Sequence, residues 1–198
     1  MRRTLRDIPY YPSPSEILED ILNNHWPYKR KDTKQFYIIR DRALISILYL
    51  LGLRISEALG LIRKQFIFPD EEGGKPNAIY VRSIELKKSR VKGRPRRIRF
   101  RDGYLPLTGE RAKLTELVVQ YLKLLRPDQK LFPFTRQRAW QIITAMTPHT
   151  CHWFRAFCED YLYEKWSRDL LAVADYVKVD PRTLQEYIRK RYEKYPIV

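Results

Sequence analysis

The sequence contains no long apolar run. Charged residues interrupt each hydrophobic stretch well before about 18 residues, which is the length that a membrane-spanning helix requires. The first residues, MRRTLRDIPYYPSPSE, also lack the apolar centre of a signal peptide. We therefore expect no membrane among the partners of this chain, and a location inside a cell.

Cysteine is scarce as well. The chain has two, Cys151 and Cys158, which lie seven residues apart in what reads as one helix. This separation is too long for a disulfide, and the pattern is not that of a zinc site. Both side chains are therefore expected to pack in the core, and no metal site is predicted.

Positive charge, in contrast, is in excess. Thirty-nine Lys and Arg residues stand against 23 Asp and Glu residues, which gives a formal charge of +16. This exceeds what solubility requires and attracts polyanions, so nucleic acid is the leading partner, although an acidic protein surface would also fit. With 198 residues, 44% of them hydrophobic, and no internal repeat, the chain is expected to form one compact domain.

The spacing of apolar residues predicts mainly helices. From 35 to 51 they recur every three or four positions, which indicates a helix that buries one broad face and that Gly52 ends or bends. A short helix is expected to begin at or just after Arg54, where free N–H groups suit an anion. Ser15 is the expected cap of a helix that runs to Asn23. Further helices are predicted at 111–125, 135–146, 147–166 (opened by Thr147 and Pro148), in a segment through 173, and at 181–192 with Asp180 as N-cap.

A small antiparallel sheet is predicted among these helices. Its strands are the β-branched and aromatic segments 65–68, 78–86 and 96–100, which turn-like sequences separate. The fold class is therefore mainly α with a small sheet. The second hairpin is strongly basic, with ten Lys or Arg between Arg82 and Arg101 against one acid, Glu85, and would repel itself unless an anion lay beside it. The DNA-binding residues expected there are Arg82, Arg90, Lys92, Arg94, Arg96 and Arg97.

One arginine, Arg54, stands in the apolar stretch LYLLGLRISEALGLI. A guanidinium stays charged, so burying it without a partner would cost several kcal/mol. It either forms a structural ion pair with Glu57, one helical turn on, or directs its charge at an anion that is absent from the sequence.

Two later stretches carry further polar residues. His152, Arg155 and Glu159 share one helix face because they are three and four residues apart. Lys178 precedes the last predicted helix, which carries Tyr187.

The order of these motifs resembles the catalytic domain of the tyrosine recombinases, or phage-type integrases. Gly-Leu-Arg-x-x-Glu, a basic hairpin, PLT, His-x-x-Arg and a tyrosine about thirty residues later follow one another between residues 15 and 191. The resemblance implies DNA cleavage and rejoining through a 3′-phosphotyrosyl intermediate, for site-specific recombination or integration, without metal or other cofactor. The residues that it assigns are the nucleophile Tyr187, the phosphate ligands Arg54 and Arg155, an active-site His152, and Lys87 or Lys88 (or Lys92) as general acid.

The chain departs from the family's pattern in three places. The family usually has Gly-His or Gly-Trp about nine residues before the tyrosine, where this chain has Val177 and Lys178, although a lysine can still donate to a phosphate oxygen. The residue after Arg155, often histidine, is Ala156. Only about 34 residues precede the long helix, so we expect a basic arm (1–14), a catalytic domain (15–191), a tail (192–198) and no separate core-binding domain.

The resemblance also implies partners and a setting. Double-stranded DNA is the expected partner, with four protomers on two synapsed duplexes. An accessory DNA-binding protein is a further option. The expected location is the cytoplasm of a prokaryotic cell, in association with the nucleoid, and the gene belongs to the cell or to its virus or plasmid.

Other interpretations stay open. A type IB topoisomerase-like enzyme would use the same cleavage, and a non-catalytic DNA-binding protein would use residues 171–192 as a helix-turn-helix, with Leu171, Val173, Val177 and Val179 packed beneath the second helix. Tyr187 and His152 would then be core residues, and the hairpin a solvated face.

Overall fold

The computed structural model describes residues 11–29, 31–86 and 98–194, without the side chains of residues 32, 187 and 190–194. The helices described are α1 (Pro14–Asn23), α2 (Lys31–Leu51), α3 (Ile55–Ala58), η2 (Arg63–Gln65), α4 (Ala112–Leu122), α5 (Arg136–Met146), α6 (Cys151–Lys165), α7 (Leu170–Val177) and α8 (Pro181–Lys194). The strands are β1 (Phe66–Ile67), β2 (Ala78–Glu85) and β3 (Phe100–Pro106). In this part of the chain no helix is both long enough and apolar enough to cross a membrane.

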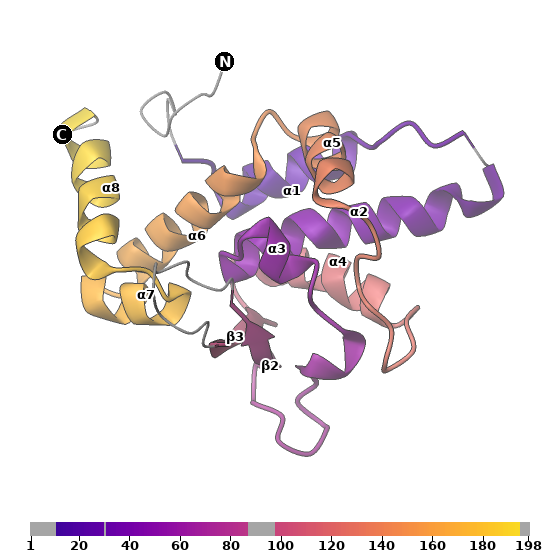
Figure 1. Cartoon of the computed structure of the whole chain (residues 1–198), viewed down its shortest axis with the longest axis horizontal. Helices are drawn as coiled ribbons and strands as arrows, with labels where there is room; N and C mark the ends of the chain where they lie inside the picture. The colour runs from indigo at the N-terminus through magenta and orange to yellow at the C-terminus, as the bar shows by residue number, and fades with distance from the viewer. Residues whose placement is uncertain (1–10, 30, 87–97, 195–198) are drawn as a thin grey trace.

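Helix α2 forms the centre of the molecule (Figure 1). It packs against α4 and α6 along its length and touches α1, α3, α5 and β3. Every residue from 43 to 53 is buried, so the second half of α2 is surrounded on all sides rather than buried along one face as its sequence predicts. Gly52 ends α2 with a positive φ of 59°, as expected.

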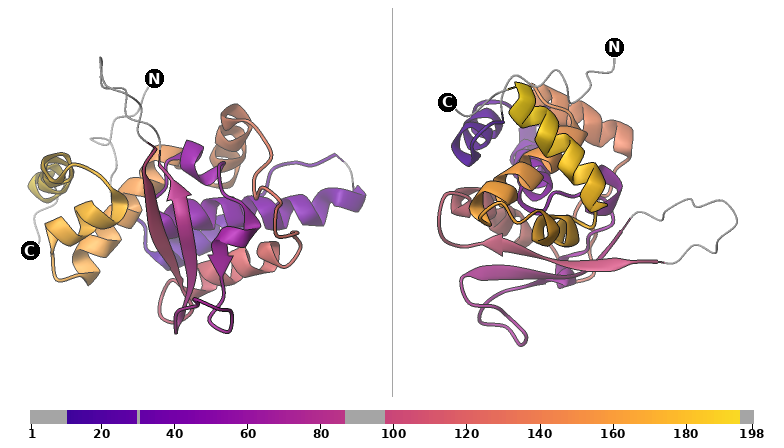
Figure 2. Two further views of the ribbon diagram at one scale, coloured as in Figure 1. Left: turned by 60° about the horizontal axis from the view of Figure 1, so that its bottom comes forward. Right: turned by 90° about the vertical axis from the view of Figure 1, so that its left-hand side faces the viewer.

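The three strands form one antiparallel sheet in the order β1-β2-β3. One face packs against α2 and α4 and contributes Ile79, Val81 and Leu105 to the core, while the other face is open (Figure 2). On the open face Tyr80 and Tyr104 pair across the strands and stack, with ring centroids 5.4 Å apart.

A bulge interrupts β2 between Val81 and Ile84, next to the basic hairpin. Ser83 adopts a positive φ of 54° there, and its N–H donates to Asp102 Oδ1 at 2.9 Å. Gln65 Nε2 donates to the carbonyls of Arg82 and Ser83 at 3.1 and 2.8 Å. These bonds satisfy the backbone groups that the bulge removes from the ladder.

The third strand lies later in the sequence than predicted. Strand β3 covers Phe100–Pro106, so the predicted 96–100 shares only Phe100 with it. Gly103 allows close packing within this strand, because a Cβ there would lie 2.8 Å from Leu51 Cδ2 and force a shift. Pro106 stands at the last position of the strand, where the loss of its N–H disturbs the ladder least.

Several helix boundaries also differ from the predictions. Ser13, not Ser15, caps α1, because its hydroxyl accepts from Glu16 N at 3.2 Å while Glu16 accepts in return. Helix α6 begins at Cys151 rather than at Thr147, whose hydroxyl instead donates to Ile143 O and ends α5. The cap of α8 is confirmed, since Asp180 Oδ1 accepts from Arg182 N at 2.9 Å.

The described residues form two hydrophobic clusters. The larger one contains buried residues of α1 to α5, of the three strands and of the first part of α6. The smaller one joins Cys158 and Leu162 of α6 to α7 and α8, through Val173, Val177 and Leu184. Leu171 was expected to pack beneath α8, but it is 68% exposed, so this part of the helix-turn-helix interpretation is wrong.

Gly52 gives a test of this packing. A Cβ at position 52 would lie 3.1 Å from Cys158 Sγ in a backbone conformation that L-residues avoid, so Gly52→Ala combines strain with a steric clash. We expect a loss of about 2 to 3 kcal/mol in the free energy of unfolding, measured by urea denaturation. Gly109→Ala is the matched control, because Gly109 has a φ of +77° but nothing within 4 Å of its Cβ, and should cost about 1 kcal/mol. Equal losses would show that Cys158 does not constrain position 52.

Candidate active site

Arg54 and Glu57 are joined at the start of α3. Arg54 is the N-cap residue, and its backbone N–H donates to Glu57 Oε2 at 2.8 Å. Its side chain donates through Nη1 to Glu57 Oε1 at 3.1 Å. The Glu57 side chain is 1% exposed and that of Arg54 is 39% exposed, so one edge of the guanidinium is held while the rest faces solvent. The structural ion pair and the anion site, posed as alternatives by the sequence, are thus compatible.

Arg155 on α6 lies beside this pair but is 4% exposed. Its Nε pairs with Glu159 Oε1 at 2.9 Å, as the shared helix face predicts. Its Nη1 donates to the carbonyl of Gly52 at 2.9 Å, and its Nη2 to that of Val177 at 2.7 Å. These two hydrogen bonds use two of its five N–H groups and tie the end of α2 to the end of α7.

One carboxylate connects the two arginines. Arg155 Nη1 lies 3.9 Å from Glu57 Oε2, while Arg54 Nη1 bonds to Oε1 of the same group. Residues about one hundred positions apart in the sequence therefore meet at one point, as the motif order requires. The two guanidiniums differ in availability, because Arg54 is partly open and Arg155 is enclosed.

His152 occupies the first turn of α6, near the same arginines. Desolvation of part of its ring lowers its pKa, and the positive charges of Arg155 and Arg54 lower it further. Since the ordinary pKa of histidine is about 6.5, this imidazole is neutral at pH 7. A neutral imidazole offers one N–H donor and one acceptor.

Lys178 ends α7 in the left-handed conformation, with φ 53° and ψ 55°. Glycine is favoured in this conformation after a helix, so the position at which a glycine would fit is Lys178 and not Val177. Val177 is instead the buried last residue of α7, and its carbonyl accepts from Arg155. The Lys178 ammonium pairs with Asp175 at 2.6 Å, and phosphate binding by Lys178 stays a prediction.

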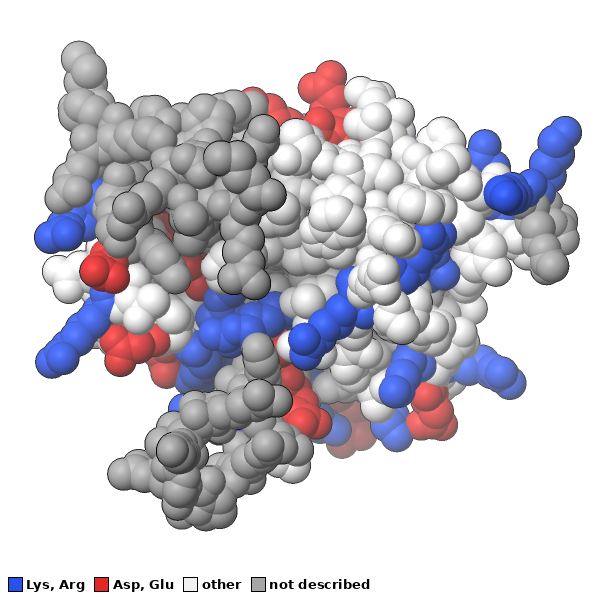
Figure 3. Space-filling view, turned by 45° about the horizontal axis from the view of Figure 1, so that its top comes forward, with Lys and Arg blue, Asp and Glu red and all other residues white. Residues whose placement is uncertain are grey.

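Tyr187 lies on α8 between the buried Leu184 and Ile188, and its side chain is not among those described. Of the predicted DNA-binding residues, Arg82 is exposed in the bulge of β2. The other hairpin residues lie outside the described part of the chain: Lys87, Lys88, Arg90, Lys92, Arg94, Arg96 and Arg97. In Figure 3, Lys and Arg gather near the middle of one face.

Sequence reasoning missed two buried arginines. Arg101 of β3 donates to the carbonyls of Leu51 and Tyr176, the latter at 2.8 Å. Arg111 precedes α4 and donates to the carbonyls of Leu50 and Tyr49, the latter at 3.3 Å. The one signal in the sequence was indirect, since the apolar end of α2 has carbonyls that need donors from elsewhere.

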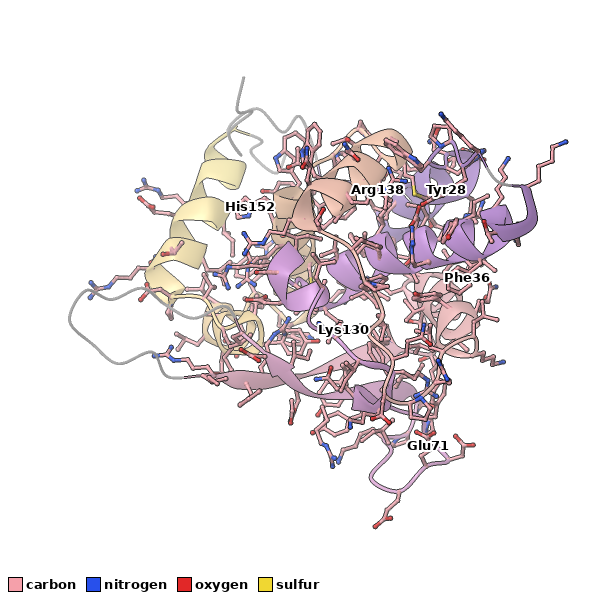
Figure 4. The ribbon with its side chains drawn as sticks, turned by 45° about the vertical axis from the view of Figure 1, so that its right-hand side comes forward. Tyr28, Phe36, Glu71, Lys130, Arg138 and His152 are labelled. Carbon is pink, nitrogen blue, oxygen red and sulfur yellow. The ribbon has the colours of Figure 1, made fainter. Side chains whose placement is uncertain are left out.

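A second polar cluster lies at the middle of α2, away from His152 in Figure 4. Tyr28 donates to the fully buried Asp41, which also accepts from Arg40 Nε at 2.9 Å. The Arg138 guanidinium stacks on Trp26, 4.1 Å from the ring centroid. These contacts hold the segment after α1 against α2 and α5. Within the residues described, no group of three or more His, Cys, Asp and Glu side chains is placed to hold a metal ion.

The sequence matches no protein-family model and no curated protein. The structure is similar to two crystal structures of the site-specific recombinase XerH. A pre-cleavage complex with a difH substrate gives a TM-score of 0.60, and a post-cleavage complex with palindromic difH gives 0.61, both at 20% sequence identity. The chain has the tyrosine recombinase catalytic-domain fold. The match covers 94% of this chain but only 52% and 51% of the XerH chains, so this chain spans about half the length of those proteins.

A further histidine, His149, lies in the loop before α6. Its ring packs against Trp153, Phe154 and Phe157, with the Phe157 centroid 4.9 Å away. Desolvation lowers its pKa to about 4. This residue is three positions before the motif histidine and has a packing role in the structure.

The low pKa of His149 predicts acid sensitivity. Between pH 6.5 and 4 the unfolded chain binds a proton at this residue and the folded chain does not, so stability falls as the pH is lowered through this range. The free energy of unfolding, measured by urea denaturation, should fall for the wild type as the pH is lowered from 7 to 4.5. After allowance for solvent screening, we expect this fall to be about 1 to 2 kcal/mol smaller for His149→Phe. The exposed His25, changed to Asn, is the control for the loss of a histidine outside the aromatic cluster. Parallel curves for His149→Phe and wild type would contradict the assignment.

Proposed function

We propose that this protein cleaves and rejoins DNA through a 3′-phosphotyrosyl intermediate, in site-specific recombination or integration. The observation that carries the proposal is the meeting of Arg54 and Arg155 at Glu57, with His152 beside them. The same Arg155 bonds to Val177, which precedes the helix with Tyr187. The shared fold with XerH supports the same function.

In this mechanism the Tyr187 phenol releases its proton to solvent, which the nearby guanidinium charges favour, and its oxygen attacks the phosphorus of a phosphodiester. A bond from the phenolic oxygen to phosphorus forms, the bond from phosphorus to the 5′-oxygen breaks, and a hairpin lysine (Lys87, Lys88 or Lys92) gives the leaving oxygen a proton. Arg54 donates to the non-bridging oxygens, where negative charge develops, and the neutral His152 adds one N–H donor. A second 5′-hydroxyl reverses the step, so the phosphodiester energy is conserved and no cofactor is consumed.

Double-stranded DNA is the proposed partner, in keeping with the formal charge of +16. Exchange between two duplexes needs two cleavages on each, and therefore four protomers. An accessory DNA-binding protein is included in the proposal, as is a mobile genetic element as the source of the gene.

Two observations favour a second candidate, a DNA-binding protein that does not cleave. Arg155 is 4% exposed, donates to two carbonyls and forms an ion pair with Glu159, which limits what it can offer to a phosphate. Lys178 is paired with Asp175 on its own helix. In this alternative Glu57 and Arg155 only stabilise the fold, and of the two arginines only Arg54 contacts the DNA backbone.

Covalent capture on DNA separates the two candidates. With a nicked suicide duplex of the protein's own target, we expect the wild type to form an adduct that survives SDS, because the released 5′-fragment diffuses away. Tyr187→Phe should form none. Arg54→Lys should slow adduct formation by about a hundredfold, since a lysine cannot present the planar pair of donors.

The matched control is Tyr104→Phe, which removes the hydroxyl of an exposed tyrosine on the open sheet face and should leave the adduct unchanged. Binding without any adduct from wild-type protein would establish the non-catalytic candidate. If an adduct forms, mixing two labelled duplexes distinguishes recombination, which yields chimeric products, from topoisomerase-like religation, which yields none.

The hairpin predicts how binding responds to salt. If its cations contact several phosphates, DNA affinity measured by fluorescence anisotropy should fall steeply with salt, and Lys92→Ala should reduce the slope of log K against log salt by about 1. The affinity loss should be similar for target and unrelated duplexes. Lys165→Ala is the control, because its ammonium already pairs with Glu110 at 2.8 Å and should leave the slope unchanged. If the DNA affinity of the wild type does not change with salt, the assignment of the hairpin to the DNA interface is wrong.

A further inference from the structure

Arg101 connects three parts of the candidate active site. It lies in β3, the strand that follows the basic hairpin, and is 4% exposed. Its Nη2 donates to the carbonyl of Leu51, three residues before Arg54, and its Nη1 to that of Tyr176, two residues before Lys178, at 2.8 Å. One guanidinium therefore joins the hairpin strand to the α2 to α3 junction and to the end of α7.

The link from β3 to α7 is reciprocal. The Tyr176 hydroxyl accepts from the backbone N–H of Tyr104 at 3.3 Å, and the Tyr176 ring lies over Arg101, with its centroid 5.1 Å from the guanidinium carbon. Because α7 and α8 pack in a hydrophobic cluster separate from the main core, such polar bonds set the position of these helices relative to the rest. Arg155, through Val177, provides a second bond of this kind.

The chemistry of this position requires arginine. A buried guanidinium is costly unless its donors are satisfied. Here Nη1 and Nη2 bond to carbonyls on different elements, while the buried Nε has no hydrogen-bond partner among the described residues. Lysine would carry the same charge, but a single ammonium nitrogen does not reproduce this fixed planar arrangement of donors. Arg101→Lys therefore keeps the charge and removes the bridge.

Arg111 provides an internal comparison. It is 6% exposed and also caps carbonyls of α2, those of Tyr49 and Leu50. Its guanidinium stacks on Tyr49 and Tyr161, and within the described residues its hydrogen bonds reach α2 and Cys158 but not α7. The two arginines thus share burial and the capping of α2, and differ in the bond to α7.

We propose that Arg101 is a positioning residue that holds the α7 to α8 segment, and with it the backbone of Tyr187, in a fixed relation to β3 and Arg54. Its effect on cleavage rests on the proposed function, whereas the coupling of β3 to α7 does not. The residue acts through the placement of other groups and makes no contact with DNA.

The experiment compares Arg101→Lys with Arg111→Lys by two readouts. The first is amide hydrogen exchange without DNA, and the second is the rate of adduct formation at saturating suicide duplex, together with the Kd. Both variants should lose similar stability. Only Arg101→Lys should speed exchange across residues 170–188 and slow adduct formation, each by about tenfold, with less than a twofold change in Kd.

Two outcomes would overturn the proposal, and a third concerns the proposed function alone. Equal acceleration of exchange at 170–188 by Arg111→Lys would overturn the proposal, because the effect would then be general loosening. Faster exchange in Arg101→Lys with an unchanged cleavage rate would also overturn it, since positioning would not matter to the reaction. A wild type without any adduct would refute the proposed function, while the exchange pattern would still decide whether Arg101 couples β3 to α7.

A milder variant covers the case in which Arg101→Lys does not fold. Tyr176→Phe removes only the hydroxyl that accepts from Tyr104 N and keeps the ring over Arg101. It should speed exchange at 170–188 by about threefold and slow adduct formation by a similar factor. An unchanged exchange pattern in a folded Tyr176→Phe variant would count against the link between β3 and α7.

Discussion

The end of α2 depends on three buried guanidiniums. Four successive carbonyls, those of residues 49 to 52, lie where every neighbouring residue is buried, so water cannot satisfy them. Arg111, Arg101 and Arg155 donate to them in turn. A buried carbonyl without a donor costs about 1 to 3 kcal/mol, so the helix could not end here without these side chains. Because the arginines come from the start of α4, from β3 and from α6, one helix terminus fixes the relative position of four elements.

These three buried guanidiniums also concentrate positive charge behind Arg54. The carboxylates of Glu57 and Glu159 offset part of it and are nearly enclosed, while the Arg54 side chain is 39% exposed. A guanidinium that opens to solvent in front of a buried cationic layer attracts an anion more strongly than an isolated surface arginine would. Glu57 also fixes both the backbone and the side chain of Arg54, so little conformational freedom is lost when a ligand arrives.

Features encoded by adjacent residues could be predicted from the sequence, and features encoded by distant contacts could not. The end of α2 at Gly52, the start of a short helix just after Arg54 and the cap at Asp180 follow from local chemistry and are confirmed. The third strand was misplaced because the need for Gly103 comes from Leu51, about fifty residues away. The burial of Arg101 and Arg111 was not predicted, since nothing near them in the chain reveals their acceptors. The pairing of Arg155 with Glu159 was visible in the spacing, but its enclosure by Gly52 and Val177 was not.

Because the interior is divided into two hydrophobic clusters, the stability of the whole domain and the local stability of the last two helices depend on different residues. Loss of a side chain such as Leu44 from the main core weakens the whole molecule, because all the central elements share it. Loss of one such as Val173 or Leu184 weakens the small cluster of the last two helices. Substitutions in that cluster therefore change how readily the C-terminal segment opens by local unfolding, while the remainder stays folded. Selection can in this way adjust how long the last two helices stay packed, independently of the melting temperature of the domain.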